Sequence, residues 1–271
     1  MRFGLVLVVL LGGAAAAAPI IAPYDPLEIS AARLEPPSGA HVMGTDVLGR
    51  DVFSRVLFGA RLSLGAALLT LTLIVAIGLT MGVVAGYYGG WLDAVLMRVA
   101  DVILAVPTVI LALAIIGLLQ TGLTSVVLAL SGVWWVRYGR VARTLVLAGR
   151  ERAFVESARA LGASDARIIV RHLLPDVVPP VLVLATLDVG AVMLAVSALN
   201  FLGLGVMPPT PEWGAMINDG KNALFVAPHV MVFPGLALTM AVLGLNLIGE
   251  GLADRLARRG GDVLTRPFRD R

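Results

Sequence analysis

The chain has 271 residues with a formal net charge of +3, and hydrophobic residues make up 58% of it. Its mean hydropathy of +0.92 and this apolar share, against roughly 45–50% in soluble domains, predict a membrane protein. The chain has no cysteine, which excludes a disulfide framework and a thiolate metal site. The basic residues are almost all arginines beside hydrophobic segments, so we expect no nucleic-acid partner.

The first hydrophobic segment covers residues 3–22, which is long enough to cross about 30 Å of hydrocarbon. Ala14 to Ala18 is similar to the small-residue cleavage site of a signal peptide, so a removed leader over residues 1–18 is the alternative to a retained helix. We expect a retained helix, because the apolar run exceeds the ~7–15 residues of a signal core and Pro19 stands at the cleavage point.

Five more hydrophobic segments follow, at about 62–87, 96–119, 123–141, 177–206 and 230–252. Together the six predict an all-α membrane protein with a single transmembrane domain over residues 1–271 and a tail at 254–271. Most arginines fall on the side of the membrane that holds both chain ends, and cytoplasmic segments are enriched in Arg and Lys. We therefore expect both termini in the cytoplasm, with residues 24–61 and 207–229 outside in contact with water and lipid headgroups.

The polar segment 151–175 has helical order and is predicted to form two short helices joined by one turn. Gly162 suits the left-handed position after the first helix, and Ser164 can cap the second. Pro175 is expected to end the second helix, and Pro179 with Pro180 to start or kink the fifth span.

The second short helix is amphipathic. Ala166, Ile169, Val170 and Leu173 recur at the spacing of one helix face, which must be buried. Either a partner protein or the chain's own membrane domain and lipid headgroups would bury it, and the pattern alone leaves both open.

Polar residues within the hydrophobic segments are costly in lipid and mark internal contacts or a pathway. Asp188, in the fifth span, either pairs with a partner helix or faces a water-filled path, and Asn200 should also avoid lipid. Arg98 and Asp101 are expected to pair with each other. The chain has no nucleotide-binding glycine loop, no GxSxG turn and no HExxH pair, so we expect neither an enzyme nor a metal site.

Several phrases resemble one known family. Glu156-Ser157-Ala158 followed by Gly162 and Leu174-Pro175 resembles the EAA loop of ABC importer permeases. The phrase GTDVLGRDVFSR at 44–55, and Asn200-Phe201-Leu202-Gly203-Leu204-Gly205, are similar to the second permease of the peptide, opine and nickel group. The resemblance covers the chain from Pro23 to about Leu256.

The resemblance implies a type I ABC importer permease fold in the bacterial inner membrane, in which segment 151–175 is the cytoplasmic coupling loop. It further implies a heterodimer with a homologous permease, two ATP-binding subunits that hold ATP and Mg, and an extracytoplasmic solute-binding protein. This chain would bind no cofactor itself. The residues that would carry the coupling are Glu156, Ala158, Gly162, Ser164, Ala166, Ile169, Val170, Leu173, Leu174 and Pro175.

Nickel or a nickel chelate and short peptides are the substrates that the resemblance implies. The phrases at 121–124, 185–190 and 212–219 are similar to nickel permeases, whereas the fifth span lacks a histidine and Val196 stands where peptide permeases often have glutamate. Asp188 and Asn200 are the candidates for the translocation path. The alternative is an ion-gradient transporter with Asp188 as the coupling carboxylate, but no internal repeat supports it.

Overall fold

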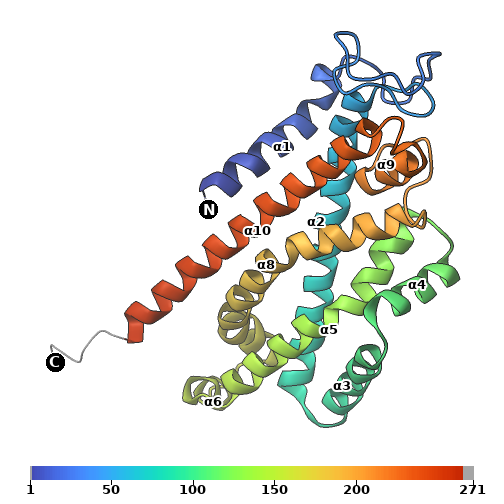
Figure 1. Cartoon of the computed structure of the whole chain (residues 1–271). Helices are drawn as coiled ribbons and strands as arrows, with labels where there is room; N and C mark the ends of the chain where they lie inside the picture. Colours follow the sequence, from blue (N-terminus) through green and yellow to red (C-terminus); the bar gives the residue numbers. More distant parts are fainter. Residues whose placement is uncertain (1, 265–271) are drawn as a thin grey trace. The chain divides into compact units, whose positions relative to one another are not determined.

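The computed structural model describes residues 2–264, and every regular element in this part of the chain is a helix (Figure 1). One isolated bridge joins Thr45 and Asp51. The elements are α1 (Arg2–Ile21), α2 (Val52–Tyr88), α3 (Gly90–Ala105), α4 (Thr108–Leu119), α5 (Leu123–Arg150), α6 (Ala153–Ala160), α7 (Asp165–Ile168), the π-helix η1 (Ile169–Leu173), α8 (Leu174–Phe201), α9 (Trp213–Gly220), the 3-10 helix η2 (Lys221–Ala223) and α10 (His229–Leu264). The all-α prediction is confirmed. Part of the expected tail, residues 265–271, lies outside the described residues.

Four helices are long and apolar enough to cross a membrane: Arg2–Ile21, Val52–Tyr88, Asp165–Phe201 and His229–Asp254. They correspond to four of the six expected spans. The expected span 123–141 is helical within α5, but α5 carries Arg137, Arg140 and Arg143 and is not among the qualifying helices.

The expected span 96–119 is not one continuous helix. It is divided between α3 and α4, which are bent by 100° at a short break, and counting this pair as one span gives five. The break follows from Pro107, because proline has no N–H to donate and keeps the preceding residue out of the helical region. Val106 is accordingly extended, with φ −105° and ψ 136°.

The chain forms two compact units. The first contains the residues up to Leu64, Thr186–Ser197 and the residues from Pro208 on, and the second contains Gly65–Ala185 and Ala198–Met207. Helices α2 and α8 therefore contribute residues to both units. A single domain over residues 1–271 stays a prediction.

In the first unit, α1 packs along α10 (Figure 1). The two helices approach closely because small residues stand at the contact: a Cβ atom on Gly4 would lie 2.7 Å from the Gly244 carbonyl oxygen. Such close approach through glycines is a common way for helices to associate in lipid.

In the second unit, α5 packs against α2, and three glycines of α2 one turn apart, Gly78, Gly82 and Gly86, face it. A Cβ atom at Gly82 would overlap the Gly139 carbonyl oxygen, so only glycine allows this backbone contact. The many glycines of this segment are therefore explained here by tight packing.

Two ion pairs join α3 to α5. Arg143 Nη2 lies 2.6 Å from Asp93 Oδ2, and Arg140 Nη2 lies 2.6 Å from Asp101 Oδ1. The expected pairing of Asp101 with Arg98 is therefore wrong. The Asp101 carboxylate pairs with an arginine on the neighbouring helix α5 and not with the arginine three residues away on its own helix.

Candidate functional site: a helical turn on a continuous span, and a charge cluster

The turn between α6 and α7 has the geometry that its glycine predicts. Gly162 has φ +80°, its N–H donates to the Arg159 carbonyl at 3.0 Å, and the Ala163 N–H donates to the Ala158 carbonyl at 3.0 Å. These two bonds define the Schellman end of a helix. The left-handed conformation expected at Gly162 is confirmed, and Ser164 occupies the N-cap position of α7 without a side-chain capping bond.

The second short helix does not end at Pro175, which corrects that prediction. Helix α7 continues through η1 into α8, so that Asp165–Phe201 is one helical run, and Pro175, Pro179 and Pro180 all lie within α8. The Leu174 N–H bonds to the Ile169 carbonyl, five residues back. This wider π-turn lies directly before Pro175. Because proline has no N–H group to donate, the helix can continue through Pro175 without a missing hydrogen bond at that position.

The predicted apolar face divides between two environments. Leu173 is 2% exposed and packs on α5, where a Cβ atom at Gly149 would meet its Cδ2 at 2.9 Å. Val170 is 60% exposed and Ala166 is exposed, whereas Ile169 is half-buried. The chain's own helices therefore bury one part of this face and leave another part open.

Two exposed apolar side chains join Val170 on this segment and were not singled out from the sequence. Leu161, at the end of α6, is 88% exposed, and Phe154 is 42% exposed. A large apolar residue at the end of a short polar helix, directly before a left-handed glycine, was the available signal. Of the other predicted coupling residues, Glu156 is exposed and Ala158 and Leu174 are half-buried.

Asn200 has a structural contact at the end of α8. It is 1% exposed, and its Oδ1 accepts a hydrogen bond from the Val206 N–H at 2.7 Å. Gly205 allows this approach, since a Cβ atom there would overlap the Asn200 Oδ1 atom. Gly203 turns the chain with φ +78°. Asn200 thus fixes the turn that leaves α8, while Asp188 is half-buried within the helix.

A cluster of ion pairs, called here the charge cluster, connects the segment between α1 and α2, and the start of α2, to α9. Asp46 lies 2.6 Å from Arg50 Nε and 3.5 Å from Arg55 Nε, and Asp219 of α9 lies 3.5 Å from Arg50 Nη2. Both arginines are 2% exposed. Two cations balance two anions here, and removing one partner of such a buried set costs about 3–5 kcal/mol.

The N-terminus of α2 is capped within the same segment. Asp51 Oδ2 accepts from the Ser54 N–H at 2.7 Å, and its Oδ1 lies 3.0 Å from His41 Nδ1. His41 also packs on the ring of Tyr24, with centroids 4.8 Å apart. Among the residues that the structure describes, no group of three or more metal-binding side chains is found.

Helix α9 is anchored by a buried carboxylate and an indole. The Ser63 hydroxyl donates to Glu212 Oε1 at 2.8 Å and the Ala215 N–H to Glu212 Oε2 at 2.9 Å. The Trp213 indole donates to the Val56 carbonyl at 2.9 Å. Glu212 is completely buried, and burial raises the pKa of its carboxyl group because the charged form is poorly solvated there.

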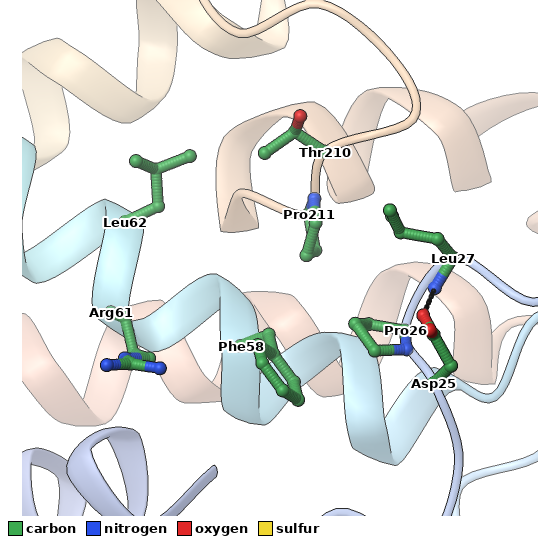
Figure 2. A pocket seen from close by; sticks show the side chains of 8 residues that line it. All are labelled: Asp25, Pro26, Leu27, Phe58, Arg61, Leu62, Thr210 and Pro211. Carbon is green, nitrogen blue, oxygen red and sulfur yellow. Dashed lines mark hydrogen bonds between the residues drawn. The ribbon is translucent and has the colours of Figure 1, made fainter. Parts of the chain in front are cut away.

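A pocket of about 500 Å³ lies beside this anchor (Figure 2). Its lining comes from the start of α2 and from the chain segments that precede α2 and α9: Asp25, Pro26, Leu27, Phe58, Arg61, Leu62, Thr210 and Pro211. The Asp25 carboxylate accepts from the Leu27 N–H at 2.8 Å. The lining is mostly apolar, and Arg61 and Asp25 supply its two charges.

Four helices are long and apolar enough to cross a membrane, and an exposed turn directly precedes one of them, so the chain is a membrane protein. Residues 78–260 match the family model of the binding-protein-dependent transport system inner membrane component. The chain belongs to this family, and it is a permease subunit of an ABC importer of the peptide and nickel group.

Curated relatives support the assignment. The chain is 44% identical over 257 residues to the nickel transport system permease protein NikC of Escherichia coli (strain K12). The aligned residues make up 94% of this chain and 93% of that protein. It is 41% identical over 222 residues to the glutathione transport system permease protein GsiD of Pectobacterium atrosepticum, covering 82% and 74%. It is 41% identical over 224 residues to the dipeptide transport system permease protein DppC of Alkalihalophilus pseudofirmus, covering 83% and 74%.

Solved structures share the fold. A chain of the MetNI methionine ABC transporter in inward-facing conformations aligns with a TM-score of 0.56 at 18% identity, covering 76% of this chain and 95% of that one. A chain of an amino acid ABC transporter crystallised with histidines aligns with a TM-score of 0.55 at 15% identity, covering 75% and 94%. The family model and the curated relatives favour the permease over the ion-gradient alternative.

Proposed function

We propose that this permease forms half of a translocation path, with a homologous second permease as the other half. Two ATP-binding subunits on the cytoplasmic side hold ATP and Mg, and an extracytoplasmic binding protein delivers the substrate. Members of this family work with separate ATPase subunits. The sequence of this chain contains no nucleotide-binding glycine loop. ATP hydrolysis therefore belongs to the partners.

The observation that carries the proposal is the build of the coupling segment, residues 151–175. Its exposed apolar side chains, Phe154, Leu161 and Val170, suit a groove on an ATP-binding subunit. Its second helix continues directly into Asp165–Phe201. A displacement of the turn by the ATPases would therefore reach the membrane span along an uninterrupted helix, as a rigid-body switch requires.

The orientation that we propose has both termini in the cytoplasm. The coupling segment then faces the ATPases, and residues 24–61 and 207–229 lie outside. The charge cluster and the hydrogen bond of the Trp213 indole would hold these outer segments rigid. The pocket between them, with Arg61 and Asp25 in its lining, is our candidate contact for the binding protein.

For the substrate we propose nickel or a nickel chelate, with short peptides as the second candidate. The support is the 44% identity to a nickel permease over nearly the whole chain, set against relatives for glutathione and dipeptides that are almost as similar. We propose Asp188 as a residue of the translocation path, because ionisable side chains within a span mark substrate or ion pathways. Asn200 is the second candidate on the path, in addition to its hydrogen bond at the turn after α8.

Uptake by a strain that carries the whole operon tests the substrate. Radiolabelled nickel uptake should fall to background when the gene for this chain is deleted, and radiolabelled dipeptide uptake should not change. Unchanged nickel uptake with lost dipeptide uptake would transfer the assignment to peptides. Asp188→Asn should reduce uptake while the ATPases still co-purify. If the complex falls apart instead, Asp188 is a structural residue and not a pathway residue.

A further inference from the structure

The coupling segment is attached to the end of α2 by one tyrosine. Tyr87 lies one residue before the end of α2 and is 7% exposed. Its hydroxyl donates to Asp165 Oδ1 at 2.6 Å, and Asp165 is the first residue of α7. The bond therefore joins the end of α2 to the beginning of the helical run Asp165–Phe201, across a sequence separation of 78 residues.

The same tyrosine also contacts the first helix of the coupling segment. Arg159 Nη2 of α6 lies 3.5 Å from the Tyr87 hydroxyl, and the Arg159 guanidinium lies over the ring at 6.0 Å from its centroid. That distance is at the outer limit of a cation–π contact. Tyr87 thus contacts residues on both sides of the Gly162 turn, so its position constrains the orientation of the turn.

The end of α2 that carries Tyr87 is itself firmly held. Arg150, at the end of α5, donates from Nη1 to the Gly86 carbonyl at 2.9 Å, which places a cation on the unpaired carbonyls of the last turn of α2. Gly86 also lies directly on α5, because a Cβ atom there would be 2.9 Å from the Arg143 carbonyl oxygen. Tyr87 therefore projects from a fixed base.

We propose that Tyr87 is a positioning residue that sets the orientation of the coupling segment toward the ATP-binding subunits. The inference rests on the proposed coupling role of residues 151–175. The buried contact of Leu173 with α5 keeps the segment attached without Tyr87. Loss of the hydroxyl should consequently leave the ATPases bound while their movement is passed on less effectively.

The test uses the complete complex in liposomes, with Tyr87→Phe, Asp165→Ala and the double variant. The readout is the factor by which the binding protein stimulates ATP hydrolysis, which requires communication across the membrane but no knowledge of the substrate. Loss of one hydrogen bond should reduce this factor about two- to tenfold. The double variant should be no worse than either single variant, because both remove the same bond.

Two matched variants separate positioning from general damage. Tyr88→Phe removes a neighbouring hydroxyl on a side chain that is 52% exposed and should behave as the unmodified chain. Asp165→Asn keeps an acceptor for Tyr87 and should retain most of the stimulation. Co-purification of the ATPases should be unchanged in every one of these variants.

Unchanged stimulation in Tyr87→Phe, or additive losses in the double variant, would overturn the inference. Leu161→Asp distinguishes this failure from failure of the coupling role itself. If Leu161→Asp releases the ATPases while Tyr87→Phe behaves normally, only the positioning role is lost. If Leu161→Asp leaves the ATPases bound and stimulated, residues 151–175 are not the coupling segment, and the inference about Tyr87 is lost with that proposal.

Discussion

Truncation of Leu161 tests the proposed coupling surface without disturbing the fold. This side chain is 88% exposed, so almost all of its apolar area is still available for burial against a partner. Full burial of a leucine contributes about 1.5–3 kcal/mol. Leu161→Ala removes most of that area, and we expect it to weaken ATPase association by about 1–2 kcal/mol, or roughly five- to thirtyfold.

Leu173→Ala is the matched comparison, because Leu173 is the same residue type in the same segment but is 2% exposed. Its truncation should destabilise the chain itself, by about 2–5 kcal/mol. ATPase binding is measured by titrating ATP-binding subunits onto the detergent-solubilised permease pair, and stability by thermal unfolding. Normal ATPase binding by Leu161→Ala, or a fall in its unfolding temperature as large as that of Leu173→Ala, would show that Leu161 is not part of a coupling surface.

Cysteines introduced singly at Ser38 and Ser164 should react with an impermeant thiol reagent from opposite sides of the membrane, and reaction of both from one side would contradict the topology. Gly162→Val forces a β-branched residue into φ +80°, which costs about 1–2 kcal/mol of strain. We expect the ATPases to bind this variant but to hydrolyse ATP without uptake. Normal uptake per ATP hydrolysed would count against this expectation. Burial raises the pKa of Glu212 above its ordinary value, so its contribution to stability is complete below the ordinary carboxyl pKa and is lost as pH rises from there through the raised pKa. The unfolding temperature of the unmodified chain should fall across this interval, and Glu212→Gln should lack this part of the fall. Parallel curves for the two chains would refute the assignment.

The features predicted correctly from the sequence are those that local chemistry determines. Long apolar runs identify the four qualifying spans, because only an apolar helix of that length is stable in lipid. Gly162 could be assigned a left-handed conformation because few other residues adopt it without strain. The motif around Glu156 and Gly162 also identified the family.

The features that were missed depend on neighbours far away in the sequence. Val170 and Leu173 have the same apolar character and lie on one predicted face, but Leu173 is buried against α5 whereas Val170 is 60% exposed. Asp101 pairs with Arg140, which is 39 residues away, rather than with Arg98. Pro175 is normally a helix stop, and only the π-turn before it allows α8 to continue.

Cross-linking from residue 161 tests the central claim most directly, because the chain has no cysteine of its own. We expect Leu161→Cys to cross-link to an ATP-binding subunit in native membranes, with a yield that changes when ATP is trapped. Phe225→Cys, a fully exposed position on the proposed outer side, should give no such product. Modification of Leu161→Cys by an impermeant reagent added from outside, with no cross-link to the ATPases, would contradict the account.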